Sequence, residues 1–316
     1  MKRYLVLWLL MISWSLLGQQ IPVATIFVES PFAFNPAVAG SDNGFKIRLN
    51  SRMQWLGFGD GPFTNMVSLY GPHAVRNIGY GANLTVDQTG PISMLKGNGG
   101  FATNFFITSD IRTSLGLNLG FIQYKADGSQ FDFPGAPSLN GGSPPAVADP
   151  AAPSVPMSSI MPDAGAGIYV YHFDWYVGIS AQQLFNNNVK FSAETNDNKL
   201  NKIMPHFFLY AGHKFYLGSQ KLVFEPTILS RIVPSLPMQL DICARIIYDR
   251  NFWGGISARN TFESFNDLSL IFGYIHERRI HVALSYDFTF AQIRNYSAGT
   301  IELVLGYNFD EVKRGR

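Results

Sequence analysis

The sequence predicts an all-β fold, a transmembrane antiparallel β-barrel of about 14 strands. Three observations lead to this prediction. Long segments alternate between apolar and polar residues, many of them reach the roughly 9–11 residues that a tilted strand needs to cross a bilayer, and the connections between them alternate in length. The composition agrees, because 14% aromatic residues, 30 glycines and only 15% charged residues suit a barrel with aromatic girdles.

The alternation is clearest at the C-terminal end. Every even position from Ile280 to Phe290 is apolar, and the odd positions are mostly small or polar; from Ile301 to Phe309 the parity is reversed. Successive residues of a strand point to opposite faces, so each segment has one face for lipid and one for the lumen. On this basis the following residues are expected to face lipid: Phe45, Ile47, Leu49, Ile280, Val282 and Leu284.

The N-terminus precedes the barrel in two parts. Lys2 and Arg3 are followed by an apolar run over 4–17, so we expect residues 1–19 to be a secretory signal peptide. Residues 20–43 are broken by prolines such as Pro31 and are expected to be an irregular segment that can enter the lumen as a plug. The barrel is expected over 44–309, and 310–316 form a polar tail.

About fourteen segments carry the alternation. They lie near 44–55, 63–72, 76–88, 98–108, 111–125, 163–173, 174–184, 203–216, 220–230, 238–250, 251–262, 266–276, 280–291 and 298–309. The segment at 220–230 is weak because it contains Pro226. With the N-terminus in the periplasm, the even-numbered connections are short periplasmic turns, and the odd-numbered ones include the two longest, 126–162 and 185–202. The glycine clusters at 57–61 and 97–100 are predicted to be turns in outer loops.

Nothing in the sequence indicates catalysis, a metal site or a cofactor. His281 and Ser285 share a face, but four residues of strand separate them by roughly 13 Å. The six histidines lack ligand spacing and are expected at interfaces or turns. Lys2 and Arg3 lie in the signal peptide, so the 24 basic residues fall to 22 and balance the 22 acidic ones, which disfavours a nucleic-acid partner.

The inward faces are expected to carry mixed charges. They are Lys46, Arg48, Arg52, Arg112, Arg245 and Arg259 with Asp87, Asp241, Asp249, Asp267, Asp287 and Glu302. Such charges could line a water-filled pore or pair across a packed lumen. They argue against a continuous apolar tunnel, which the alternative function, FadL-like passive transport of hydrophobic small molecules, would need.

Two stretches before and after the first strand are more specific than barrel physics requires. Residues 35–40 read Asn-Pro-Ala-Val-Ala-Gly, and 52–64 run from Arg52 through Gln54 and Trp55 into a glycine-rich turn that ends in Pro62. Both resemble the opening elements of the PorP/SprF family of the type IX secretion system. Residues 162–169, with Gly165 and Gly167, are similar to the family's glycine-rich strand after its long loop.

The resemblance implies an outer-membrane protein of a Gram-negative bacterium. It would act with other type IX secretion components and with outer-membrane lipid, and bind or anchor a secreted cargo, such as an adhesin with a C-terminal signal domain. The motif residues that could contact a partner are Asn35, Pro36, Gly40, Arg52, Gln54, Trp55, Gly57, Phe58, Gly61 and Pro62. The alternative is architectural: Trp55 in a girdle, glycines in turns, and Arg52 paired with a wall carboxylate such as Asp87.

Overall fold

The computed structural model describes residues 24–74, 77–127, 157–189, 202–218, 221–234, 236–261 and 264–311. The expected signal peptide, the proline-rich centre of 126–162 and residues 312–316 lie outside these ranges. Within the described chain, no helix has the length and apolarity needed to cross a membrane.

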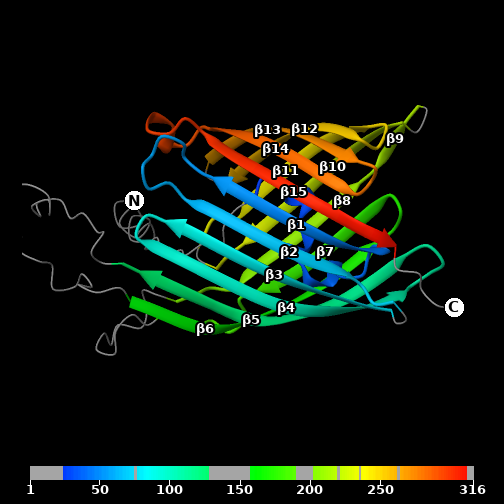
Figure 1. Cartoon of the computed structure of the whole chain (residues 1–316), viewed down its shortest axis with the longest axis horizontal. Coiled ribbons are helices and arrows are strands. Elements are labelled where there is room, and N and C mark those ends of the chain that lie inside the picture. Colours follow the sequence, from blue (N-terminus) through cyan, green and yellow to red (C-terminus); the bar gives the residue numbers. More distant parts are fainter. Residues whose placement is uncertain are drawn as a thin grey trace, which may run out of the picture.

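The described strands form one closed antiparallel barrel with a 14-strand wall, as predicted (Figure 1). Each strand pairs with the next, β15 pairs with β1, and β10 pairs with β11. Two labelled strands, β8 and β9, belong to one wall strand, because both pair with β10 on either side of Lys214. The strands are β1 (Gly44–Met53), β2 (Phe63–Pro72), β3 (Ile78–Thr89), β4 (Ile92–Phe106), β5 (Arg112–Ala126), β6 (Met157–Tyr171), β7 (Trp175–Gln182), β8 (His206–His213), β9 (Phe215–Leu217), β10 (Leu222–Ile232), β11 (Gln239–Tyr248), β12 (Phe252–Thr261), β13 (Ser264–His276), β14 (Ile280–Thr289) and β15 (Thr300–Glu311).

The outer face is apolar, as the alternation predicts. Leu49 and Leu284 are exposed on the outside of the wall, whereas the inward-facing Arg48 and Ser285 are buried. Aromatic pairs lie near the strand ends: the rings of Phe252 and Tyr274 are 4.8 Å apart, and other pairs occupy the opposite end of the wall. This distribution is that of an outer-membrane barrel.

Two expectations about the strands are wrong. Gly97–Gly100 do not form a turn but lie inside β4, paired with both β3 and β5. Glycine is compatible with both a turn and a strand at these positions, because it is common in turns and also in strands that a neighbouring backbone or side chain approaches closely. Asp249 is not on an inward face but in the turn after β11, with a φ of 50°. The expected strand at 220–230, weakened by Pro226, is present as β10, displaced by two residues to Leu222–Ile232.

The two ends of the barrel differ in their connections. At one end, here called the short-turn end, the connections are 73–77, 107–111, 172–174, 218–221, 249–251 and 277–279. The opposite end, here called the long-loop end, carries 54–62, 127–156, 183–205 and 290–299 among others. β1 begins and β15 ends at the short-turn end, where Gly44 pairs with Glu311.

Residues 24–43, here called the plug, lie inside the barrel (Figure 1, dark blue). The plug contains three short 3-10 turns, η1 (Phe27–Glu29), η2 (Pro31–Ala33) and η3 (Pro36–Val38). Its side chains Ile26, Phe27 and Ala37 are fully buried. The lumen therefore holds the largest apolar core of the described chain, made by the plug against apolar residues of the inner wall.

Candidate functional site

The plug keeps its shape through the motif that starts at Asn35. The side chain of Asn35 accepts a hydrogen bond from Ala37 N–H at 2.9 Å and so caps η3, and Pro36 occupies the first position, where no N–H is needed. Gly40 ends the element with a φ of 76°, a conformation that favours glycine. The motif therefore folds locally into a rigid, capped turn.

Wall glycines receive this turn at van der Waals contact. A Cβ at Gly116 would lie 2.3 Å from Ala37 N, and one at Gly167 would lie 2.1 Å from Asn35 Oδ1. Both positions sit on inward faces, on β5 and β6. Any other residue type would push the plug away from the wall, so these glycines and the motif at 35–40 form one packing unit.

Polar side chains of the wall satisfy the plug backbone. Phe34 C=O accepts from Ser180 Oγ at 2.6 Å and from Gln182 Nε2 at 3.3 Å. Ala39 C=O accepts from Asn104 Nδ2 at 3.2 Å. Since an unpaired buried backbone group is costly, these bonds fix the depth at which the segment sits in the lumen.

A first charge cluster anchors the start of the plug near the long-loop end. The Arg52 guanidinium lies 2.8 Å from both Asp287 and Glu302, and all three side chains are at most 1% exposed. Thr25 joins the cluster: its N–H donates to Glu302 at 2.7 Å and its hydroxyl donates to Asp287 at 2.8 Å. Arg259 extends the cluster to Asp241 at 2.6 Å.

A second cluster surrounds Glu29, the only acidic residue of the three 3-10 turns. Arg245 lies 2.8 Å from its carboxylate and His281 Nδ1 lies 3.0 Å from it, and Arg48 Nε donates to its backbone oxygen at 3.1 Å. Burial raises the pKa of the Glu29 carboxyl, but the His281 hydrogen bond and the charges of Arg245 and Arg48 outweigh burial and hold that pKa well below its usual value.

The two clusters make the plug costly to release. Removing one partner of a buried ion pair costs about 3–5 kcal/mol, because it leaves an uncompensated buried charge. Pulling residues 24–29 out of the lumen would strip Glu302 of two backbone donors and would separate Glu29 from three wall side chains. Both clusters therefore hold the start of the plug against the wall.

The second half of the motif lies at the rim of the long-loop end. Gln54 N–H donates to Pro62 C=O at 2.9 Å, which closes the 54–62 loop, and a Cβ at Gly61 would lie 2.4 Å from Gln54 O. Trp55 adopts a φ of 54° and its ring packs edge-on against Phe58, with 6.2 Å between centroids. The chain needs Gly57 here as well, at a φ of 86°.

The structure separates motif residues that the sequence places together. Asn35, Pro36 and Gly40 lie in the lumen and Arg52 lies in the first charge cluster, whereas the residues of the 54–62 loop lie at the rim. Asn35 does not meet Arg52; it donates to Ile168 C=O on β6 instead, at 3.0 Å.

The suggested pairing of Arg52 with Asp87 is wrong. Arg52 pairs with Asp287 and Glu302, and Asp87 accepts from Thr64 Oγ1 at 2.5 Å. The expectation that histidines lie at interfaces or turns is wrong for His281, which contacts the plug, and for the fully buried inward His206.

The sequence reasoning missed several lumen residues. Glu29 was not singled out, although a lone carboxylate in the apolar run 26–34 is a signal for a buried ion pair. Lys96 and Asp163 pair at 3.0 Å, and the sequence does not predict this pair, because the interpretation of 97–100 as a turn places Lys96 outside a strand. In the described part of the chain, no group of three or more His, Cys, Asp and Glu side chains is placed to hold a metal ion.

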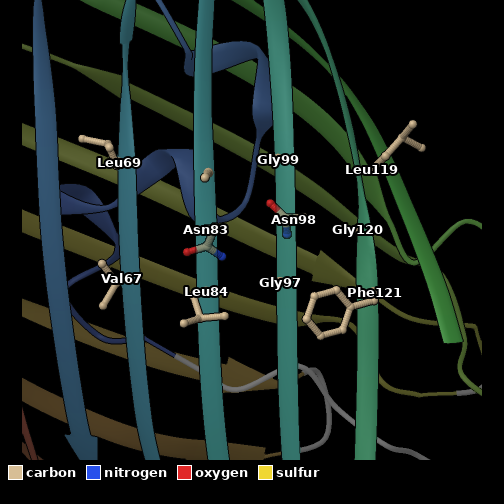
Figure 2. A pocket seen from close by; sticks show the side chains of 11 residues that line it. Val67, Leu69, Asn83, Leu84, Gly97, Asn98, Gly99, Leu119, Gly120 and Phe121 are labelled. Atoms are coloured by element: carbon tan, nitrogen blue, oxygen red, sulfur yellow. The ribbon is translucent and has the colours of Figure 1, made fainter. Parts of the chain in front are cut away.

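An apolar hollow on the outer face is separate from this site. Figure 2 shows it over β2–β5, with Leu69, Leu84 and Phe121 around a floor that includes Gly97 and Gly99. Its walls belong to the lipid-facing side of the barrel, on the opposite side of the wall from the plug. The hollow is therefore a feature of the membrane-contacting surface and not of the lumen.

Comparisons with solved structures support the fold. The TodX deltaS2S3 mutant monoaromatic hydrocarbon channel has a TM-score of 0.52 and 14% identity, over 88% of this chain and 94% of that one. A Pseudomonas aeruginosa FadL homologue has a TM-score of 0.50 and 12% identity, over 87% of this chain and 93% of that one. The CymD monoaromatic hydrocarbon channel has a TM-score of 0.50 and 12% identity, over 93% of this chain and 95% of that one. At such identities the likeness shows a shared barrel architecture alone.

No curated protein matches the chain significantly. The family model for the type IX secretion system membrane protein PorP/SprF matches residues 16–307, which include the plug and almost all of the barrel. With this match and an outer-membrane barrel fold, the chain belongs to the PorP/SprF family, a Gram-negative outer-membrane component of the type IX secretion system.

Proposed function

We propose that this barrel binds a secreted cargo protein with a type IX C-terminal domain and holds it at the long-loop end, without conducting solute and without catalysing a reaction. The family match supports a place in type IX secretion. The proposal that the barrel binds cargo rests on the plug that fills the lumen and on the surface of the long-loop end.

The observation that carries the proposal is the anchored plug. Phe27 and Ile26 are fully buried in the middle of the lumen, and both charge clusters join the plug to the wall. A barrel whose centre is filled and anchored in this way offers partners its mouths and rim, and not a path through it. Holding a partner is the role that such a surface supports.

The rim of the long-loop end has the features of a binding surface. Two connections from different hairpins pair with each other: Leu56 N–H donates to Gly299 C=O at 2.8 Å, and Ala298 N–H donates to Leu56 C=O at 2.7 Å. Aromatic side chains stand on this paired surface, with Phe58 43% and Tyr296 71% exposed. Exposed aromatic side chains on hydrogen-bonded, ordered backbone are typical of the centres of protein interfaces.

Passive transport of hydrophobic small molecules is the competing function. The fold likeness to hydrocarbon channels is compatible with it. The inner wall, however, carries buried charges such as Arg52, Arg245 and Glu302 around the plug, and a hydrophobic solute would have to pass them.

Mass spectrometry of material that co-purifies from mild-detergent extracts of the native outer membrane tests the proposal. We expect a near-stoichiometric, large secreted protein with a C-terminal signal domain. The Phe58→Ala and Tyr296→Ala variants should lose it, and Tyr248→Ala, an exposed aromatic at the opposite end, should keep it. Recovery of the barrel alone with bound lipid or fatty acid would contradict the proposal and favour transport.

A further inference from the structure

A cavity of about 370 Å³ opens at the short-turn end, between the plug and the wall strands β1, β5–β8, β10 and β11. We call it the vestibule. Residues of three separate parts of the chain meet there: Ser41–Asn43 from the plug, Asp110 and Arg112 at the start of β5, and His172–Phe173 in the next turn. Its volume lies in the usual range of ligand pockets, about 300–1,000 Å³.

Four tyrosines form one wall of the vestibule. The rings of Tyr169 and Tyr171 stack at 5.3 Å, and those of Tyr176 and Tyr210 stack at 5.0 Å. The wall is built to hold them, because a Cβ at Gly212 would lie 2.4 Å from the Tyr176 hydroxyl oxygen.

The hydroxyls of this wall are used unequally. Tyr176 donates to Glu225 at 3.1 Å and accepts from Tyr210 at 3.2 Å. For Tyr169 no hydrogen bond occurs within the described ranges, although its ring lines the cavity. The wall therefore presents aromatic faces and an available phenol donor.

The charges of the vestibule leave two cations over. Lys46 pairs with Asp42 at 2.6 Å, and Arg245 pairs with Glu225 at 3.0 Å. Arg112 and Lys214 line the same cavity and form no ion pair with any described residue.

Neither of these two cations has a carboxylate within ion-pair distance in the described ranges, although the charge of Lys214 acts on the Asp42 carboxylate. The Arg112 guanidinium rests 4.6 Å from the Phe106 ring, and Lys214 N–H donates to Asp174 C=O through the backbone alone. Among the carboxylates that line the vestibule, Asp110 is the one that forms no ion pair with a described residue. Two lining cations and one lining carboxylate are therefore left without an ion pair, which is an excess of one positive charge.

We propose that the vestibule binds a carboxylate next to an aromatic or aliphatic side chain, supplied by an acidic segment of a partner polypeptide. Arg112, Lys214 and the Tyr169 hydroxyl would receive the carboxylate, and the tyrosine faces would pack on its neighbour. Arginine and tyrosine are among the side chains most enriched at the centres of protein interfaces. This site lies at the short-turn end of the barrel. The proposal is therefore independent of whether a cargo binds at the long-loop end.

Binding of a capped Ala-Glu-Phe-Ala peptide to the full-length barrel in lipid nanodiscs tests this site, with the Gln-for-Glu peptide as the uncharged match. We expect the Glu peptide to bind about tenfold more tightly than the Gln peptide, because the Gln side chain has no carboxylate to form the charge-assisted hydrogen bond. Arg112→Gln and Lys214→Gln should each remove most of that preference. Lys221→Gln, at the same end but outside the vestibule, should leave it unchanged.

Three results would overturn the proposal. Equal affinity for the two peptides would remove the carboxylate from recognition. An unchanged preference in Lys214→Gln, a substitution that breaks no ion pair with a described residue, would place the binding site elsewhere. Phenylacetate that binds as tightly as the acidic peptide would identify a free small acid and not a polypeptide as the ligand.

Discussion

Arg52 and Glu302 face each other across the seam between β1 and β15, and the carboxylate oxygen that accepts from Arg52 at 2.8 Å also accepts from Thr25 N–H at 2.7 Å. The strand pair that joins the two ends of the barrel thus also anchors the plug. Barrel closure and plug docking share one buried carboxylate, which gives the closed state its stability at the seam.

Glu302→Gln should destabilise the folded barrel by about 3–5 kcal/mol, because it leaves Arg52 short of one buried partner. Equilibrium unfolding in urea, followed by tryptophan fluorescence in detergent, measures this. The matched control is Asp310→Asn, which removes the exposed partner of Arg279 and should cost about 0–1 kcal/mol. Equal effects of the two substitutions would show that the seam pair has no special role.

Gly116→Val should loosen the plug, because its Cβ would lie 2.3 Å from Ala37 N. Amide hydrogen exchange of residues 35–40 should then rise strongly while exchange of the wall strands changes little. Gly99→Val is the control: its Cβ would face open space on the outer side, with Gly81 O as the nearest atom at 4.0 Å. Unchanged protection of 35–40 in Gly116→Val would contradict the close packing.

Acidification should weaken the second charge cluster. The folded pKa of Glu29 lies below its ordinary value of 4.5, so the stabilisation it contributes is fully present above pH 4.5 and is lost as the pH falls toward the folded pKa. The difference in unfolding free energy between wild type and Glu29→Gln should therefore be constant near neutral pH and shrink by about 1.4 kcal/mol per pH unit below that value. A difference that stays flat on acidification would contradict the prediction.

Single cysteines should report the orientation of the barrel. Phe58→Cys at the long-loop end should react with a membrane-impermeant thiol reagent on intact cells, whereas Arg279→Cys at the short-turn end should react only after permeabilisation. Leu49→Cys and Leu284→Cys, on the lipid face, should stay unreactive. The native Cys243 is fully buried and gives no background. Reaction of Arg279→Cys on intact cells would reverse the orientation.

The strands were predictable because one rule decides them. A wall between lipid and lumen forces period-two alternation, so β14 and β15 could be placed to within two residues at each end. The starts of β4, at 92 against a predicted 98, and of β6, at 157 against a predicted 163, were not predictable in this way, and the glycines at 97–100 hide the pattern beside Lys96. Glycine has no side chain, so a run of glycines does not indicate which residues face lipid and which face the lumen.

The partners of the plug could not be predicted in the same way. Thr25 meets Glu302 across 277 positions, and alternation says which residues face inward but not which of them a plug will approach. Arg52 had several inward carboxylates available to it, and its choice of Asp287 and Glu302 over Asp87 follows from the seam pairing and from the position of the plug.

The most direct test of the central claim is the ionic conductance of the purified wild-type barrel in a planar lipid bilayer. A lumen filled by an anchored plug predicts a membrane that stays at its baseline conductance after insertion, at neutral pH and moderate voltage. Steady, ohmic channel openings in the wild-type protein would show an open path past the plug. That result would contradict the account of a closed barrel that acts by holding a partner.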